Sequence, residues 1–409
     1  MSLISRSNLI ALLLIGFATA SQFIKQAWLA SIFDPAIYAG WATAVLASQM
    51  LFNFGGLGFH NFSARQAAIY ENRGKKFLTN SLVSKQILLY TYLLPLSIPI
   101  IYFLLAEPEK TFFAAVVLYS LAHVFLNAVT CPAYVRSSLT FSNIQAKRGV
   151  GSTIVAVAIC LYTGSLILTL ITEAFFVFVL GLLTLKSQRI KWVRSHTMFG
   201  AGCKALAPFF FPVLLATFSV SLSRLIAIEV LGDESLGIYY FIFLVVSCGV
   251  IFQYGVSVIF GPIITSKLDQ NLSHNLIRFI FKTWASLVVV ALLLGILGYF
   301  LFPVLIKYFF AEYATGVILI FPMLCLAMAK ICDIWSVYFL LGGLEKYLYL
   351  PHLISILTIT VIFFAVQKNN NISLVDMSYF VFGEAIAIFV TPLLTFVWIN
   401  RKLRATEIT

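Results

Sequence analysis

The sequence has 409 residues, of which 61% are hydrophobic and only 10% are charged. A soluble domain carries about 25% charged residues, so this composition excludes an ordinary water-soluble enzyme or binding domain. The formal net charge of +12 would suggest a nucleic-acid partner in a soluble protein. Here the basic residues lie in short segments between apolar runs, which is typical of membrane topology, and we expect no nucleic acid as partner. The six cysteines have no metal-ligand spacing, and we expect neither a metal nor a cofactor.

Apolar runs recur along the whole chain at the length that crosses a bilayer, about 20 residues for about 30 Å of hydrocarbon. The sequence therefore predicts an all-α polytopic membrane protein with twelve transmembrane helices. We place them at 8–31, 38–59, 82–105, 111–134, 148–164, 166–185, 207–231, 236–260, 280–305, 314–342, 347–367 and 377–399.

The segment from Arg148 to Lys186 is long for one such helix and short for two. Both of its flanks are basic, which places both on the cytoplasmic side and requires an even number of crossings. We therefore predict two short helices with a turn near Thr163–Ser165.

With twelve helices, each basic residue outside them can be assigned to one side of the membrane. Twenty-one Lys and Arg residues fall in segments on the side of the two termini, and three (Lys110, Lys307 and Lys368) fall on the other side. Basic residues favour the cytoplasmic side. We expect a bacterial inner-membrane protein with both termini in the cytoplasm.

The chain divides into two halves of six predicted helices each. We predict an N-terminal bundle at 1–188, a basic cytoplasmic linker at 189–206, a C-terminal bundle at 207–400 and a cytoplasmic tail at 401–409. The turn Phe33-Asp34-Pro35 before Tyr38 in the first half resembles Leu231-Gly232-Asp233 before Tyr239 in the second. Repeated bundles of this kind are typical of transporters whose halves move relative to each other.

Ionisable residues inside predicted helices are the candidate functional residues, because each costs about 3 kcal/mol at a helix centre on insertion scales. Lys25 and Arg224 occupy similar positions in the two halves. If they face a wet cleft between the bundles, they form a cationic chamber that would bind a phosphate group. In the alternative interpretation, each side chain extends to the outer membrane surface.

Three further ionisable residues lie in the last helices. Lys330 and Asp333 are three residues apart on one helical face and can neutralise each other; Lys330 is also a weaker candidate for the cationic chamber. Glu384 has no local partner, and such a buried carboxyl group can carry a coupling proton. A cationic partner on another helix would remove that role.

Two polar stripes complete the candidate residues. Tyr119, His123 and Asn127 are spaced four residues apart in one predicted helix, and Gln49 and Asn53 form a second stripe in another. Such stripes line a sugar path or form hydrogen bonds between helices; both interpretations stay open.

Several of these features together resemble a known family. They are the twelve helices in two halves, the acidic turn followed by a helix that opens with Tyr or Trp, the Gly-rich helix end Asn53-Phe54-Gly55-Gly56-Leu57-Gly58, and the basic segment Arg65–Lys76. The pattern resembles the bacterial polysaccharide flippases, the O-antigen repeat-unit (Wzx-type) exporters of the multidrug/oligosaccharidyl-lipid/polysaccharide (MOP) superfamily.

The resemblance implies a flippase that moves undecaprenyl-pyrophosphate-linked oligosaccharide from the cytoplasmic to the periplasmic leaflet by alternating access, coupled to an ion gradient. A polysaccharide polymerase and a chain-length regulator are the implied protein partners. The cationic lumen of that family would correspond to Lys25 and Arg224, with Lys330 as a further candidate.

Two other functions stay open. A multidrug antiporter of the related family would need acidic lumen residues, and a non-transporting subunit of a glycan-assembly complex would tolerate loss of the buried cations. An enzyme is not expected, because the sequence has no P-loop, no zinc-protease motif and no nucleophile elbow.

Overall fold

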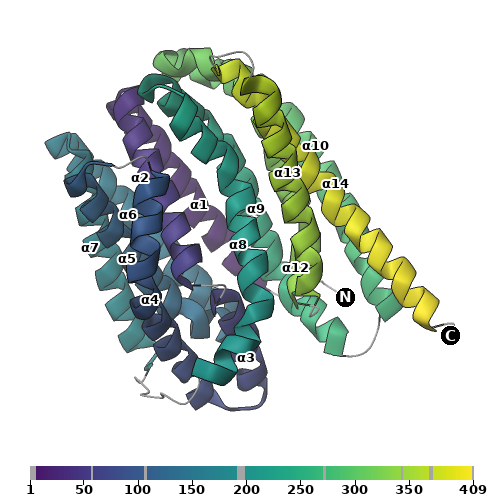
Figure 1. Cartoon of the computed structure of the whole chain (residues 1–409). Helices are drawn as coiled ribbons and strands as arrows, with labels where there is room; N and C mark the ends of the chain where they lie inside the picture. Colours follow the sequence, from purple (N-terminus) through teal and green to yellow (C-terminus); the bar gives the residue numbers. More distant parts are fainter. Residues whose placement is uncertain are drawn as a thin grey trace. The chain divides into compact units, whose positions relative to one another are not determined.

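The computed structural model describes residues 6–56, 59–105, 108–190, 199–269, 273–341, 344–367 and 372–407. The chain divides into two compact units, unit 1 (Met1–Thr217) and unit 2 (Phe218–Thr409), and the division falls within helix α8 (Phe199–Val230). Unit 1 begins with seven helices (Figure 1). They are α1 (Arg6–Ile32), α2 (Pro35–Gly56), α3 (Phe59–Asn72), α4 (Lys76–Leu104), α5 (Lys110–Arg136), α6 (Ser138–Thr163) and α7 (Leu166–Ser187).

Unit 2 continues from the end of α8, and in it α13 and α14 lie side by side (Figure 1). Its elements are α9 (Asp233–Asp269), α10 (Ser273–Phe309), the 3₁₀ helix η1 (Ala311–Leu319), α11 (Ile320–Ile331), α12 (Ile334–Leu341), η2 (Glu345–Leu348), α13 (Tyr349–Val366) and α14 (Leu374–Glu407). Within the unit, α11 packs against α9, α10 and α14.

The all-α fold class is confirmed, and each predicted span coincides with helical structure. Ten segments of the described chain are long and apolar enough to cross a membrane. Helices α1 and α2 coincide with the first two predicted spans, and with them the structure accommodates twelve. The protein is a polytopic integral membrane protein.

The predicted turn between the fifth and sixth spans is confirmed. Helix α6 ends at Thr163, and Gly164 follows in the left-handed conformation with φ of 62°. Glycine suits this position because it has no Cβ to clash there. The Ser165 side chain then accepts a hydrogen bond from the Leu168 N–H and caps the start of α7.

Several helices are joined by one or two residues. Two residues join α1 to α2 (Phe33 and Asp34), α6 to α7, and α8 to α9, and Phe310 alone joins α10 to η1. At the first of these connections the Asp34 carboxylate accepts a hydrogen bond of 2.8 Å from the Ile37 N–H. It thereby satisfies one of the free N–H groups at the start of α2.

Three predicted boundaries are corrected by the structure. The predicted span 314–342 is not one helix, because η1, α11 and α12 divide it, with a break at Cys332 and Asp333. The basic segment Arg65–Lys76 is largely helical, since α3 extends to Asn72. Helix α8 begins at Phe199, inside the predicted linker 189–206, whose residues 191–198 lie outside the described residues.

Helices α1 and α6 of unit 1 approach each other closely. A Cβ atom placed on Gly149 of α6 would lie 2.5 Å from the carbonyl oxygen of Ala18 in α1. No side chain fits there, so the glycine allows the two backbones to touch, as small residues do between membrane helices. The Thr153 hydroxyl of α6 reinforces this contact by donating to the Ser21 carbonyl oxygen at 2.8 Å.

Candidate functional site

A buried ion pair joins helices α1 and α7 of unit 1. The Lys25 ammonium of α1 lies 2.7 Å from Oε1 of Glu173 in α7, and the two side chains are 1% and 0% exposed. The Tyr119 hydroxyl of α5 donates to the same oxygen at 3.4 Å, and Glu173 Oε2 has no hydrogen-bond partner among the described residues. Lys25 therefore neither extends to the membrane surface nor carries an uncompensated charge.

Aromatic and amide groups surround this ammonium. Lys25 Nζ lies 5.4 Å from the centroid of the Trp41 ring of α2, within the range of cation–π attraction. The Trp41 indole N–H donates to the Gln26 side-chain oxygen at 2.7 Å. These contacts hold the ring and the ammonium in fixed positions in a region that excludes water.

A second polar contact lies next to the pair. Arg148 of α6 places NH2 2.7 Å from His123 Nδ1 and NH1 3.4 Å from the Asn127 side-chain oxygen, both in α5. The rings of His123 and Tyr119 are 4.4 Å apart between centroids. The stripe predicted in this helix therefore forms hydrogen bonds between helices. We call Lys25, Glu173, Tyr119, His123 and Arg148 the unit 1 cluster.

Unit 2 has its own buried acid. Glu384 of α14 is 0% exposed, and its Oε2 accepts a hydrogen bond of 2.8 Å from the Ser223 hydroxyl of α8, while Oε1 has no hydrogen-bond partner in the part of the chain that the structure describes. The positive charges of Lys330 and Arg224 both act on this carboxylate. We call Ser223, Arg224, Lys330 and Glu384 the unit 2 cluster.

The two clusters differ in how acid and base meet. In the described part of the chain, ion pairs within 4.0 Å form at Lys25–Glu173 and Arg136–Glu71 and not at Glu384. Arg224 stacks on the Phe243 ring, with Cζ 4.9 Å from the centroid, and also donates to the Val220 carbonyl oxygen. The unit 2 cluster thus holds two bases and one acid that is out of direct ionic contact with them in the described chain, and the Asp333 carboxylate also acts on Lys330.

Asp333 has a different role from the predicted one. It precedes α12, and its Oδ1 accepts hydrogen bonds from the N–H (3.1 Å) and the hydroxyl (2.8 Å) of Ser336. Its Oδ2 accepts a bond of 2.8 Å from the Gln253 amide of α9. Among the described residues, Lys330 and Asp333 form no direct ion pair, because the helix break gives the carboxylate a capping task. Their charges nevertheless act on each other.

The second predicted stripe lies on α2. Gln49 is exposed and Asn53 is half-buried on α2. The cleft that Lys25 and Arg224 were predicted to share stays a prediction.

The sequence placed Glu173 inside a helix, but it paired neither Glu173 with Lys25 nor Arg148 with His123. The positions of Lys25 and Glu173 along their helices could have indicated the pair. Lys25 lies seven residues before the end of α1 at Ile32, and Glu173 lies seven residues after the start of α7 at Leu166. Both helix ends adjoin two-residue turns. Arg148 was assigned to a cytoplasmic flank, but α6 begins at Ser138 and places it ten residues inside the helix.

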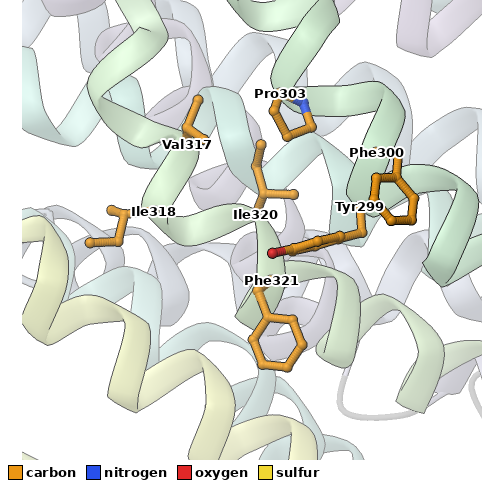
Figure 2. Close-up of a pocket in the computed structure, with 7 residues that line it drawn as sticks. All are labelled: Tyr299, Phe300, Pro303, Val317, Ile318, Ile320 and Phe321. Carbon is orange, nitrogen blue, oxygen red and sulfur yellow. The ribbon is translucent and has the colours of Figure 1, made fainter.

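Two apolar hollows lie elsewhere in unit 2. One, of about 400 Å³, lies between α10 and the η1–α11 segment, where Tyr299 is the lining residue with a polar side chain (Figure 2). The other, of about 260 Å³, is lined by apolar residues and cysteines of α10, α11 and α14. Neither has a charged lining residue, so neither suits a charged head group.

Comparison with known proteins identifies the fold. No family model and no curated protein match the chain. Solved structures do match over nearly its whole length, at TM-scores of 0.64 to 0.67. One is an inward-facing multidrug resistance MATE family transporter of the MOP superfamily, at 11% identity, covering 99% of this chain and 100% of that chain with a TM-score of 0.65.

Two further structures give the same result. A MATE in complex with MaL6 is 13% identical and covers 99% of this chain and 100% of that one, with a TM-score of 0.67. A mutant of the Vibrio cholerae MATE transporter VcmN is also 13% identical and covers 98% and 96%, with a TM-score of 0.64. The chain therefore has the fold of the MATE transporters of the MOP superfamily, as the resemblance in its sequence implied at that level.

Proposed function

We propose that the protein is a transporter of the bacterial inner membrane that moves an undecaprenyl-pyrophosphate-linked oligosaccharide from the cytoplasmic to the periplasmic leaflet by alternating access. One observation carries the proposal: the unit 2 cluster buries two basic side chains, Arg224 and Lys330, whose charges both act on the buried carboxylate of Glu384. The likeness to MATE transporters supports transport, and the two buried basic side chains support an anionic substrate.

The physical argument concerns the cost of buried charge. A cation removed from water is costly unless an opposite charge or hydrogen-bond acceptors replace its hydration. The two bases of this cluster offer their donors to an anionic group, while the carboxylates of Glu384 and Asp333 act on Lys330. A pyrophosphate supplies several acceptor oxygens, which suit the planar fork of an arginine and the point charge of a lysine.

Lys25 has a smaller part in this proposal than the sequence suggested. Its ammonium is in contact with Glu173 at 2.7 Å, so its charge is already neutralised within unit 1. We therefore assign anion binding to Arg224 and Lys330.

A multidrug antiporter is the second candidate, because the structural neighbours include multidrug resistance transporters. A cationic drug needs a buried acid whose charge is available. Glu173 is in direct contact with an ammonium, and two positive charges act on Glu384, so the buried charges favour an anion over a cation. A non-transporting assembly subunit is the third candidate, and it would tolerate neutral residues at Arg224 and Lys330.

Binding to the purified full-length protein in detergent tests the proposal. We expect native mass spectrometry to show retention of undecaprenyl pyrophosphate and not of ethidium. Arg224→Gln should weaken retention by about 10- to 150-fold, since a hydrogen bond to a charged group contributes about 1.5–3 kcal/mol. Retention of ethidium without the polyprenyl lipid would instead support the multidrug function.

Arg136→Gln is the matched control. It removes an arginine that forms an ion pair of 2.9 Å with Glu71 in unit 1, and it should leave affinity for the lipid unchanged. Equal affinity in the wild type, Arg224→Gln and Lys330→Gln would contradict the assignment of these residues. In cells that depend on this chain, normal surface glycan with Arg224→Gln/Lys330→Gln would favour the non-transporting subunit.

A further inference from the structure

The turn between α3 and α4 gathers positive charge at the start of α4. Three basic side chains, Arg73, Lys75 and Lys76, lie within four residues, and all three are exposed. In the described chain none of them forms an ion pair within 4.0 Å. The next residue is Phe77, whose side chain is 64% exposed. We call Arg73–Phe77 the basic turn.

The acid closest in sequence does not neutralise these bases. Glu71 is the only acidic residue between Asp34 and Glu107. Its Oε1 lies 2.9 Å from Nε of Arg136 at the end of α5, and NH2 of the same guanidinium donates to the Asn80 side-chain oxygen at 3.3 Å. Because this carboxylate is already paired with α5, the basic turn keeps its positive charge.

Backbone hydrogen bonds hold the bases in place. Gly74 follows α3 with φ of 69°, a left-handed conformation that glycine adopts without a clash. Its N–H donates to the Glu71 carbonyl oxygen at 2.9 Å, and the Lys75 N–H donates to the Tyr70 carbonyl oxygen at 2.8 Å. This pair of bonds is the Schellman pattern, which ends a helix in a defined turn. The backbone of the basic turn is therefore ordered before any ligand binds, which lowers the entropy lost on binding.

The position of the basic turn along α4 places it among lipid head groups. Helix α4 begins at Lys76, and the apolar span predicted for it begins at residue 82. Six residues of helix cover about 9 Å, and the head-group layer on each side of the hydrocarbon is about 5–8 Å thick. The flexible stems of lysine and arginine extend a charged group toward its preferred layer. The three bases can therefore reach the lipid phosphates, and Phe77 adds an exposed apolar ring one residue closer to the hydrocarbon.

We propose that the basic turn is a binding surface for an anionic phospholipid, whose phosphate lies among Arg73, Lys75 and Lys76 while its acyl chains stay in the bilayer. Charge complementarity favours an anionic over a zwitterionic lipid, because a choline head group brings a positive charge next to the three bases. The start of α4 adds to the attraction, since the positive end of a helix dipole lies there and the cap residue Lys75 makes no side-chain hydrogen bond to it. None of these residues belongs to the two buried clusters, so the proposal does not depend on the transported substrate.

Native mass spectrometry of the full-length protein in detergent tests the proposal. Phosphatidylglycerol is titrated onto the protein, with phosphatidylcholine of the same acyl chains as the zwitterionic reference. We expect the wild type to bind phosphatidylglycerol more tightly than phosphatidylcholine. Lys75→Gln/Lys76→Gln should weaken phosphatidylglycerol binding by about 25-fold, since each base near an anionic lipid surface contributes about 5-fold. Its binding of phosphatidylcholine should stay unchanged.

Lys110→Gln/Lys307→Gln is the matched control. It removes the same formal charge from two other exposed lysines, one at the start of α5 and one near the end of α10. Each of these lysines has an exposed acid within five residues, Glu109 and Glu312 respectively. Neither therefore lies in a region of purely positive charge, and the control should bind phosphatidylglycerol as the wild type does.

Two further variants separate charge from folding. Lys75→Arg/Lys76→Arg keeps both charges and should keep the binding, while Arg73→Gln alone should weaken it by about 5-fold. A ligand that binds the folded protein also raises its melting temperature. Phosphatidylglycerol should therefore raise the melting temperature of the wild type more than that of Lys75→Gln/Lys76→Gln.

Equal affinity of the wild type for the two lipids, or equal losses in Lys75→Gln/Lys76→Gln and in the control, would overturn the proposal. Two other anions are tested in the same way. Displacement of phosphatidylglycerol by an equal concentration of inorganic phosphate would mean that the basic turn binds free phosphate instead. Weakened binding of undecaprenyl pyrophosphate to Lys75→Gln/Lys76→Gln, with phosphatidylglycerol binding unchanged, would assign the basic turn to the transported lipid.

Discussion

The ion pair of Lys25 and Glu173 makes a strong prediction about stability. Its nitrogen and oxygen are 2.7 Å apart and both side chains are almost completely buried. Replacing Lys25 with Met leaves a buried carboxylate without its base, and replacing Glu173 with Gln leaves a buried ammonium without its acid. The double variant Lys25→Met/Glu173→Gln removes both charges and keeps similar side-chain volumes.

The expected magnitudes follow from the contact distance. Two unit charges 2.7 Å apart attract each other by about 6 kcal/mol at an effective dielectric constant of about 20. Much of this offsets the loss of hydration, so breaking a buried pair by removing one partner costs about 3–5 kcal/mol, whereas a neutral pair of similar volume is often nearly as stable. We expect each single variant to be destabilised by about 3–5 kcal/mol and the double variant to be closer to the wild type than either.

Thermal unfolding of the purified protein in detergent measures this coupling. For a unit of this size, 1 kcal/mol shifts the melting temperature by about 2–4 °C, so each single variant should melt roughly 6–20 °C below the wild type. Tryptophan fluorescence at a fixed scan rate gives the four melting temperatures of the cycle. A double variant whose loss equals the sum of the two single losses would refute the argument, because two groups without mutual interaction behave additively.

Two smaller predictions concern helix packing and helix capping. Gly149→Ala places a Cβ 2.5 Å from the Ala18 carbonyl oxygen, and it should lower the free energy of unfolding by about 1–3 kcal/mol through overpacking. The control Gly16→Ala meets nothing within 4 Å and should not lower the melting temperature. Equal effects of the two variants would contradict the close approach. Asp333→Ala removes the cap of α12 and should lower the free energy of unfolding by about 0.5–2 kcal/mol, whereas Asp333→Asn can still cap and should lower it much less. Equal melting temperatures of these two variants would contradict the capping role.

The sequence predicted the helical architecture well because the membrane imposes simple rules. Helix length follows hydrocarbon thickness, and the turn that the structure shows at Gly164 and Ser165 lies where two crossings were predicted, although Arg148 lies inside α6 and does not flank it. These signals are local, and each depends on a few residues that adjoin in the chain.

The sites were predicted less well because their contacts are not local. Lys25 and Glu173 are 148 residues apart, and nothing in either segment by itself indicates the other. The break at Cys332–Asp333 was missed for a different reason: neither residue prevents a helix, and Asp333 acts as a cap only because Ser336 and Gln253 lie where its two oxygens can accept from them. Lys330 and Asp333 were paired by assuming a continuous helix.

The short connections in the chain restrict how its helices can move. A two-residue linker spans only about 7 Å even when fully extended, so the end of α1 cannot separate from the start of α2, and the same holds for α6 with α7 and for α8 with α9. The two helices of each pair are therefore held together at one end and can separate only at the other. In any conformational change the joined ends must move together, and the helices can separate only at their far ends. The distance between two probes placed on either side of a joined end should therefore hardly change.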